Sequence, residues 1–289
     1  MRTIALTALA MLAFAANSVL ARLALAPGDL GALGYTGIRL VSGAAMLAAL
    51  LYIRRDGEAR RLVAGSWPAA AALFAYALAF SIAYLLLGAG TGALILFVSV
   101  QFGILGWAVF RGDRPGPAEW LGLMLALAAL VFLVAPGLVA PPWPGTLLMI
   151  VAGLSWAAYT LLGRGSRAPL ADTAGNFIRC LPPALVLLIA GGLSQVHDLR
   201  LIACAIASGA LASGLGYAIW YGVLPALSRT GAGLVQLTVP AIAAAGGVLL
   251  LGEPLTPRLL LASMGILGGV ALALFAAEGR KKAKVRSPG

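Results

Sequence analysis

The sequence has few charged residues and almost none of the side chains that bind metals or carry redox chemistry. Only 10% of its 289 residues are charged, and it contains one histidine and two cysteines. Cys180 and Cys204 lack the spacing of a metal or redox site, so we expect them to be small core residues. The motifs His-Glu-x-x-His and Gly-x-Ser-x-Gly and a phosphate-binding loop are all missing. We therefore expect no catalytic residue, no metal, no cofactor and no ATP-driven pump.

Apolar residues dominate what is present. They make up 62% of the chain, and its mean hydropathy is +1.00, which is more apolar surface than a soluble domain can bury. A helix needs about 20 apolar residues to cross a hydrocarbon core about 30 Å thick, and long runs without strict alternation favour helices over barrel strands. The sequence predicts an all-α membrane protein with ten transmembrane helices, at residues 4–25, 31–53, 66–87, 91–110, 118–136, 144–163, 173–193, 199–221, 230–251 and 257–277.

The positive charges predict the orientation of the chain. The net charge is +11, and an N-terminus in the cytoplasm places 15 of the 20 Lys and Arg residues on the cytoplasmic side. Arg22, Arg200 and Arg258 fall outside, and Arg39 and Arg179 fall within helices. Positive charge gathers on the cytoplasmic side of membrane proteins, so we expect both termini inside a bacterial-type inner (plasma) membrane and no nucleic-acid partner. The basic tail 280–289 either serves this topology or binds acidic lipid headgroups.

An internal repeat appears when the sequence is laid on itself at an offset of 140. Ile38-Arg39 then matches Ile178-Arg179, Gly112-Asp113 matches Gly252-Glu253, and Pro117 matches Pro257. Five helices per half is an odd number, so the second half must enter the membrane in the opposite orientation, as in many carriers. We expect a first repeat at 1–138 and a second at 139–279. The apolar run after Met1 resembles a cleavable secretory signal, but its removal would leave nine helices, so we expect it to be retained.

Small residues predict where helices pack closely. The pairs Gly122-x-x-x-Ala126 and Gly265-x-x-x-Gly269 lie on the fifth and tenth segments, which the repeat makes equivalent. We expect these two segments to pack on each other within one chain, with a dimer face as the alternative. The chain is accordingly expected to be a monomer.

Polar and aromatic side chains within the segments are the candidate substrate-binding groups, because a polar group in lipid needs a partner. Tyr76, Phe80 and Tyr84 share one helix face, which either lines a cavity or faces lipid. Arg39 and Arg179 either extend to headgroups or hold an anionic group of the substrate. Pro240 is expected to kink its helix in the middle, as a gate or as a static bend. The cavity candidates are Asn17, Arg39, Phe80, Tyr84, Ser99, Gln101, Trp156, Tyr159, Arg179, Tyr217 and Gln236.

Acidic residues are missing from the middle of the segments. All nine lie in loops or at helix ends, and the single histidine, His197, lies beside an external loop. A proton-coupled exporter of lipophilic cations commonly needs a buried carboxylate. We therefore expect facilitated diffusion down the substrate gradient rather than obligatory proton antiport.

Three motifs carry a resemblance to a known family. They are Gly-Glu-Pro-Leu-Thr at 252–256 after a segment containing Pro240, the weaker Gly-Asp-Arg-Pro at 112–115, and Leu-Ser-Trp-Ala at 154–157. Together with the ten segments they resemble the EamA family of the drug/metabolite transporter superfamily. The first half departs from the pattern, with Asp113 in place of the glutamate and Val100 at the position of Pro240. Glu253 is expected to be structural and to cap the start of the tenth helix.

The resemblance implies a metabolite exporter with a central cavity between the halves, and the aromatic inventory makes it most similar to the aromatic amino-acid exporters. The preferred hypothesis is a carrier that exports neutral or aromatic amino acids, or related small metabolites, by alternating access. Its partners would be a small-molecule substrate and the lipid bilayer. The alternatives are a proton-coupled exporter of drugs, toxic compounds or other metabolites and, from another class, a membrane scaffold or channel-like protein that does not alternate.

Overall fold

The structure is a computed structural model that describes residues 2–54, 64–112, 115–134, 140–163, 166–191, 198–223, 226–227 and 235–286. Throughout these residues the regular structure is helical, which confirms the all-α class. The elements are α1 (Arg2–Leu25), α2 (Ala32–Arg54), α3 (Trp67–Ala83), α4 (Ala89–Phe110), α5 (Pro117–Val134), α6 (Trp143–Leu162), α7 (Pro169–Arg179), α8 (Leu181–Ala190), α9 (Leu199–Ala207), η3 (Ser208–Leu215), α10 (Gly216–Val223), α12 (Thr238–Leu251) and α13 (Pro257–Arg286).

Six stretches of helix among the described residues are long and apolar enough to cross a membrane, and a seventh is gained if α7 and α8 count as one bent span. Trp67–Ala83, Pro117–Leu133 and Thr238–Leu251 are apolar but shorter. Every expected segment thus coincides with a helix or with consecutive helices, whereas the count of ten spans and the inverted repeat stay predictions. The proposed boundary between 138 and 139 lies outside the described residues.

One of the expected segments is broken, and another is continuous but irregular. The segment expected at 173–193 is α7 followed by α8, bent by 41°, because Pro182 and Pro183 cannot donate backbone hydrogen bonds to the preceding turn. The segment expected at 199–221 contains the π-helix η3 between α9 and α10. Such wide turns are frequent at functional sites, and here η3 supplies side chains to the centre of the molecule.

Pro240 lies in the first turn of α12, whose helical residues begin at Thr238. The expected kink in the middle of a helix is therefore wrong, because a proline in the first turn removes no helical hydrogen bond. Residues 230–234, which the expected segment also included, lie outside the described residues. A gating role for Pro240 stays a prediction.

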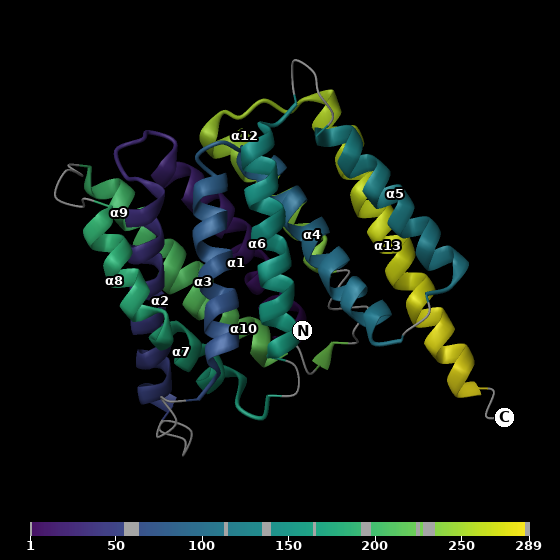
Figure 1. Ribbon diagram of the computed structural model, residues 1–289, viewed down its shortest axis with the longest axis horizontal. Helices are drawn as coiled ribbons and strands as arrows, with labels where there is room; N and C mark the ends of the chain where they lie inside the picture. The colour runs from purple at the N-terminus through teal and green to yellow at the C-terminus, as the bar shows by residue number, and fades with distance from the viewer. Residues whose placement is uncertain are drawn as a thin grey trace.

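α5 and α13 lie side by side at one end of the longest axis, beyond the main bundle (Figure 1). A Cβ atom added at Gly122 would lie 2.5 Å from the Gly269 carbonyl oxygen, and one at Gly269 would lie 2.5 Å from the Gly122 carbonyl oxygen. Only glycine allows this approach, so the expected packing within one chain is confirmed. At the ends of the pair, Arg280 Nε lies 2.5 Å from Glu119 Oε1, and Arg258 Nη2 donates to the Phe132 carbonyl at 2.7 Å.

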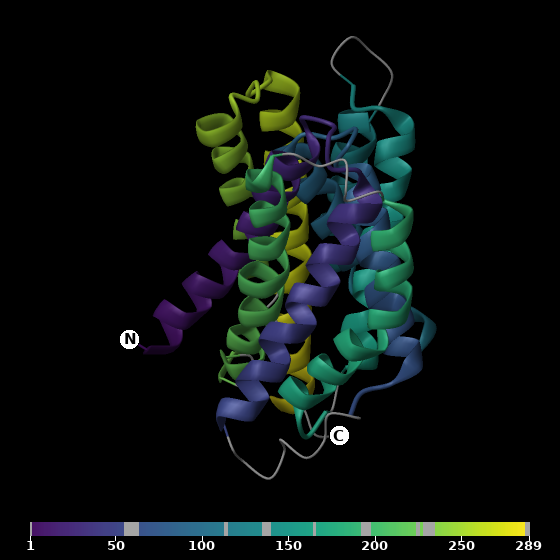
Figure 2. The same ribbon diagram turned by 90° about the vertical axis from the view of Figure 1, so that its left-hand side faces the viewer.

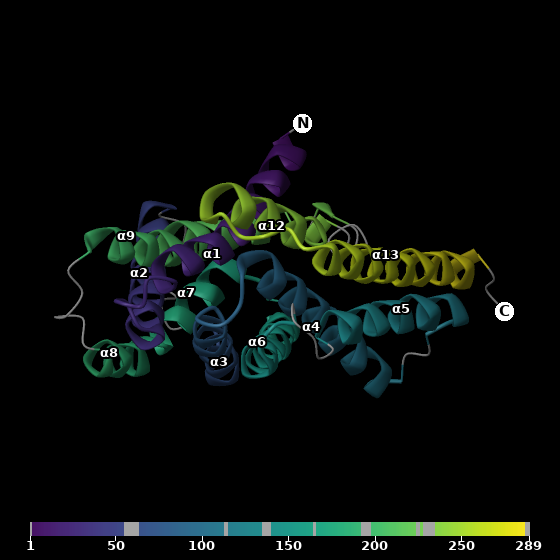
Figure 3. The same ribbon diagram turned by 90° about the horizontal axis from the view of Figure 1, so that it is seen from above.

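The main bundle is built around α1, which is inclined to the other helices (Figure 2). α1 packs on α9, η3, α10 and α12, whereas α6 packs on α3 and α4. α2 packs on η3, α8 and α7, which brings the first half of the chain against the second (Figure 3). This interface between the halves encloses the central cavity.

Candidate functional site

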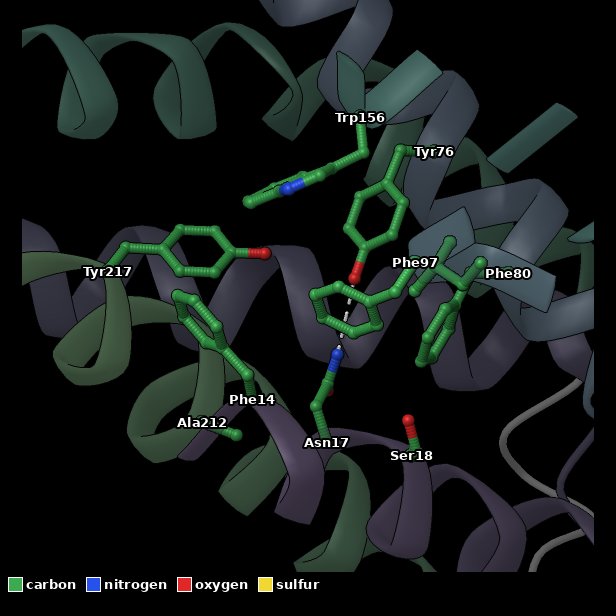
Figure 4. Close-up of a pocket in the computed structure, with 10 residues that line it drawn as sticks. Phe14, Asn17, Ser18, Tyr76, Phe80, Phe97, Trp156, Ala212 and Tyr217 are labelled. Atoms are coloured by element: carbon green, nitrogen blue, oxygen red, sulfur yellow. Dashed lines mark hydrogen bonds between the residues drawn. The ribbon is translucent and has the colours of Figure 1, made fainter. Parts of the chain in front are cut away.

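A cavity in the middle of the bundle is lined by aromatic side chains and by a few polar groups. On α1, the positions Phe14, Asn17 and Ser18 share one face because they are three to four residues apart. Tyr76 and Phe80 share a face of α3 for the same reason. The full lining is Phe14, Asn17, Ser18, Tyr76, Phe80, Leu96, Phe97, Trp156, Ala212 and Tyr217, from α1, α3, α4, α6, η3 and α10 (Figure 4).

The rings of the lining pack against one another across the cavity. The Trp156 ring centroid lies 4.8 Å from that of Tyr76 and 5.0 Å from that of Tyr217, and the Phe14 centroid lies 5.8 Å from that of Tyr217. The centre of a water molecule can occupy about 20 Å³ of this space, which is enough for about one water. The cavity is therefore contracted, and a larger molecule enters only when the rings move apart.

A chain of buried hydrogen bonds runs from α2 to α3 past the cavity. The Tyr35 hydroxyl donates to Ser208 Oγ at 2.7 Å, and Ser208 Oγ donates to Asn17 Oδ1 at 2.5 Å. Asn17 Nδ2 in turn donates to the Tyr76 hydroxyl oxygen at 3.4 Å (Figure 4). The chain joins both halves of the sequence, since Ser208 belongs to η3.

Arg39 lies directly behind the wall of the cavity and is 2% exposed. Its Nε donates to Ser213 Oγ at 3.2 Å, and its Nη2 donates to the Tyr76 hydroxyl at 3.0 Å. Its guanidinium carbon lies 4.8 Å from the Phe80 ring centroid and 5.1 Å from the Tyr76 centroid. Its Nη1 is buried and has no hydrogen-bond partner among the described residues. Arg39 is thus a buried cation whose hydrogen bonds go to neutral hydroxyls.

No acidic side chain of the described residues lines the cavity. Glu119 pairs with Arg280, and Glu253 pairs with Arg22. Asp172 accepts a hydrogen bond from the Gly65 amide. Asp56, Glu58, Asp113 and His197 lie outside the described residues. A buried charge without an opposite charge is expensive, so Arg39 marks the place where an anionic group would be stabilised.

Several predicted site residues come together here. Asn17, Phe80, Trp156 and Tyr217 line the cavity. Arg39 contacts the lining from behind, and the Tyr159 ring lies 5.4 Å from that of Trp156, one layer further out.

The other candidates lie elsewhere. Ser99 donates to the Ile95 carbonyl of its own helix and packs where a Cβ at Gly153 would contact it, so it belongs to the α4–α6 interface. Arg179 Nη1 donates to the carbonyls of Ala64, which precedes α3, and Gly175, which lies within α7. Gln101 and Gln236 are half-buried, and Pro240 is buried. All three lie outside the cavity lining.

The sequence candidates omit six lining residues. Phe14 and Ser18 lie on the same helical face as Asn17, and Tyr76 belongs to the same aromatic stripe as Phe80, so helical spacing carries a signal for these three. Leu96, Phe97 and Ala212 resemble any other apolar residue of the chain, and no feature of the sequence separates them.

One end of the bundle is closed by an ion pair between the halves. Arg22 Nε, near the end of α1, lies 3.1 Å from Glu253 Oε1, and Arg22 Nη1 donates to the Tyr84 carbonyl at 2.9 Å. Both carboxylate oxygens of Glu253 accept from the Ala89 amide, at 3.0 and 2.7 Å. We call Arg22, Glu253 and the Ala89 amide the Arg22–Glu253 lock. Tyr84, a predicted cavity residue, lies in this region rather than in the cavity lining.

The lock corrects one expectation. Glu253 does not cap the tenth helix, α13, as the sequence predicts; it caps the N-terminus of α4, where a carboxylate is favoured by the unpaired amides and the helix dipole. The cap of α13 is Thr256, whose Oγ1 accepts from the Leu259 amide at 3.1 Å.

The opposite end of α1 borders an open cleft of about 460 Å³. Its walls come from the first turns of α1, the ends of α2 and η3, α10 with the residues after it, and the start of α7. The residues are Arg2, Thr3, Leu6, Leu50, Leu170, Leu215, Ala218, Ile219, Gly222, Val223 and Ala226. Between this cleft and the central cavity, Phe14 packs on Tyr217 and, at 5.9 Å between centroids, on Trp220. The Arg22–Glu253 ion pair therefore lies at one end of the bundle. At the other end, the cleft extends to the aromatic cluster of Phe14, Tyr217 and Trp220.

Comparison with known proteins agrees with this architecture. The model of the EamA-like transporter family matches residues 143–275. The uncharacterized protein PA1977 of Pseudomonas aeruginosa is 53% identical over 279 residues, covering 96% of each chain. The threonine/homoserine exporter RhtA of Escherichia coli is 30% identical over 243 residues, covering 80% of this chain and 78% of its own. A chain of known crystal structure, 20% identical, superimposes with a TM-score of 0.62 over 95% of this chain and 99% of that one, and so shares its fold.

The chain belongs to the EamA-like transporter family. It is a membrane-embedded transporter of the drug/metabolite superfamily and not an enzyme, which confirms the resemblance carried by the motifs.

Proposed function

We propose that the protein exports amino acids, neutral or aromatic, or related small metabolites, and that Arg39 holds the carboxylate of the substrate. The observation that carries the proposal is the buried Arg39 guanidinium, which has an unpartnered Nη1 and lies 4.8 Å from the Phe80 ring of an aromatic cavity. A guanidinium is suited to a carboxylate, and the rings of Tyr76, Trp156 and Tyr217 suit an apolar or aromatic side chain. RhtA, which is named as an amino-acid exporter, supports the same substrate class.

The proposed mechanism is alternating access between two five-helix halves of opposite orientation, at 1–138 and 139–279. The packing of the helices supports it. α1 packs on α9–α10 and α12 of the other half, and α6, its counterpart in the repeat, packs on α3 and α4. This reciprocal arrangement is what a pseudo-two-fold axis in the membrane plane produces. A cavity on such an axis is reached from each side in turn.

The two ends of the bundle supply the gates in this proposal. With both termini in the bacterial cytoplasm, Arg2 and the open cleft face inward, and the Arg22–Glu253 lock faces outward. The structure then corresponds to a carrier that is closed to the outside and ready to load from the cytoplasm. Export proceeds when the lock opens and the Phe14–Tyr217–Trp220 cluster closes the inner path.

The lack of an acid in the cavity lining, as far as the described residues show it, favours facilitated diffusion by a monomer over proton antiport. It also disfavours the alternative cargo, a lipophilic cation, because the buried Arg39 charge repels a cation. A scaffold that moves nothing requires neither the uncompensated charge nor the cavity.

Counterflow in liposomes tests the proposal. Liposomes that contain the full-length protein are loaded with unlabelled phenylalanine. We expect them to take up labelled phenylalanine transiently and with saturation, without a pH gradient. A strict requirement for a proton gradient would refute facilitated diffusion. Linear uptake without counterflow would indicate a channel, and the lack of any uptake above protein-free liposomes, for phenylalanine and threonine alike, would refute amino-acid transport.

A further inference from the structure

Two hydrogen bonds beside the cavity converge on the hydroxyl group of Tyr76. Its hydroxyl oxygen accepts one hydrogen bond from Arg39 Nη2 at 3.0 Å and another from Asn17 Nδ2 at 3.4 Å. A phenol oxygen has two lone pairs, so both are used and only its own proton is left for a further partner. The Tyr217 hydroxyl, which also belongs to the cavity lining, is a further hydrogen-bond partner of Tyr76.

The acceptors of the same network are already engaged. Asn17 Oδ1 accepts from Ser208, and Ser208 Oγ accepts from Tyr35. Ser213 Oγ accepts from Arg39. Among the described residues, the group of this network that is left without a partner is therefore Arg39 Nη1, which is a donor.

The Arg39 donor and its positive charge fit one end of an amino acid better than the other. A carboxylate is an acceptor with a negative charge, so it suits the unpartnered Arg39 Nη1 donor. An ammonium group is a donor with a positive charge, and the lining offers it no carboxylate among the described residues. In a site this dry, an ammonium near Arg39 adds repulsion and loses its hydration.

We infer that the cavity takes aromatic monocarboxylates without an ammonium group, and binds them more tightly than it binds the corresponding amino acids. The inference rests on the proposed function, since it assigns the substrate carboxylate to Arg39. It adds that net charge is the selective property. In a series with the same ring and chain length, affinity falls from net charge −1 to 0 to +1.

Competition binding to full-length protein in lipid nanodiscs at pH 7.5 tests this order with 3-phenylpropionate, phenylalanine and phenethylamine. The three ligands differ only in which charged groups they carry, and all are ionised at this pH. We expect 3-phenylpropionate to displace labelled phenylalanine at a concentration at least tenfold below that of unlabelled phenylalanine. The concentration of phenethylamine needed for the same displacement should be at least tenfold above that of unlabelled phenylalanine. Phenylalanine equal to or better than 3-phenylpropionate, or displacement by phenethylamine as good as either, would overturn the inference.

Two substitutions connect the order to Arg39. Arg39→Lys keeps the charge and should keep the order, whereas Arg39→Gln should bring the three ligands to within about threefold of one another. Arg200→Gln, at an exposed arginine, is the matched control and should behave as the wild type. An unchanged order in folded Arg39→Gln protein would remove Arg39 from the inference, and if that variant does not fold, the wild-type series alone decides.

The outcomes separate the inference from the proposed function. Phenylalanine counterflow without preferential binding of 3-phenylpropionate would refute the inference and leave amino-acid export standing. Direct binding of labelled 3-phenylpropionate without phenylalanine counterflow would refute amino-acid export and leave the inference standing. Binding of neither ligand would overturn both.

Discussion

At the scale of single residues, the account depends on a positive charge that is buried without a negative partner among the residues that the structure describes. Arg39 is tolerated because the Tyr76 and Ser213 hydroxyls accept two of its N–H groups, and because the rings of Tyr76 and Phe80 face its plane. The remaining N–H has no such partner among the described residues. Tyr76 therefore connects the two features, because it accepts a hydrogen bond from Arg39 and also lines the cavity.

Replacement of Tyr76 by phenylalanine removes one hydroxyl and leaves the ring in place. We expect Tyr76→Phe to weaken binding of 3-phenylpropionate about tenfold, because one hydrogen bond of about 1.4 kcal/mol is lost. The thermal midpoint should also fall, because Arg39 Nη2 loses its acceptor. Equilibrium binding in nanodiscs and a thermal shift assay measure the two effects. The matched control is Tyr52→Phe at a side chain that is 77% exposed, and an equal effect of both variants would contradict the role given to Tyr76.

The sequence predicts part of this site. Polar groups and an aromatic stripe are conspicuous in an apolar chain, so Asn17, Arg39 and Phe80 are recognisable as candidates from the residues alone. Arg179 occupies the equivalent place in the repeat, yet its guanidinium binds the Ala64 and Gly175 carbonyls. The sequence could not separate the two arginines, because the difference depends on which segment packs beside each one.

At the scale of helices, apolar length predicted where each element lies, and the breaks within elements were harder. The turn between α7 and α8 follows from Pro182 and Pro183, which are visible in the sequence. The π-helix η3 carries no such marker, because its Gly and Ser residues are also common in straight membrane helices. A Cβ at Gly209 would lie 2.1 Å from the Arg39 carbonyl, so close packing on α2 accompanies the irregular turn.

The Arg22–Glu253 lock joins the end of α1 to the start of α4. Loss of the lock can be detected by amide hydrogen exchange at the start of α4. We expect Glu253→Gln to raise the rate of amide hydrogen exchange at the start of α4 at least tenfold, because the Ala89 amide loses a charged acceptor and Arg22 loses its ion pair. Exchange measured by mass spectrometry on peptides spanning 85–95 reports this effect.

The matched control for the lock is Asp29→Asn, an exposed carboxyl in the turn that follows α1. It should leave exchange at the start of α4 unchanged. Unaltered exchange in Glu253→Gln protein, or an equal rise in both variants, would mean that the lock does not hold the two halves together.

At the scale of the whole molecule, the chain consists of a bundle that encloses a contracted cavity and a separate pair of helices, α5 and α13, packed through glycine (Figure 1). The all-helical class and the family followed from composition and a few motifs. The small volume of the cavity did not, because it depends on how closely side chains from distant segments pack. The central claim is that both faces of the membrane reach this cavity in turn.

Labelling of a single cysteine in the cavity tests that claim most directly. Ser18 lines the cavity and is 1% exposed, and Cys180 and Cys204 are the only native cysteines. In a Ser18→Cys variant that also carries Cys180→Ala and Cys204→Ala, we expect a membrane-impermeant maleimide to react from the external face in whole cells and from the cytoplasmic face in inverted vesicles. Saturating 3-phenylpropionate should slow both reactions. Reaction from one face alone, with and without ligand, would contradict alternating access.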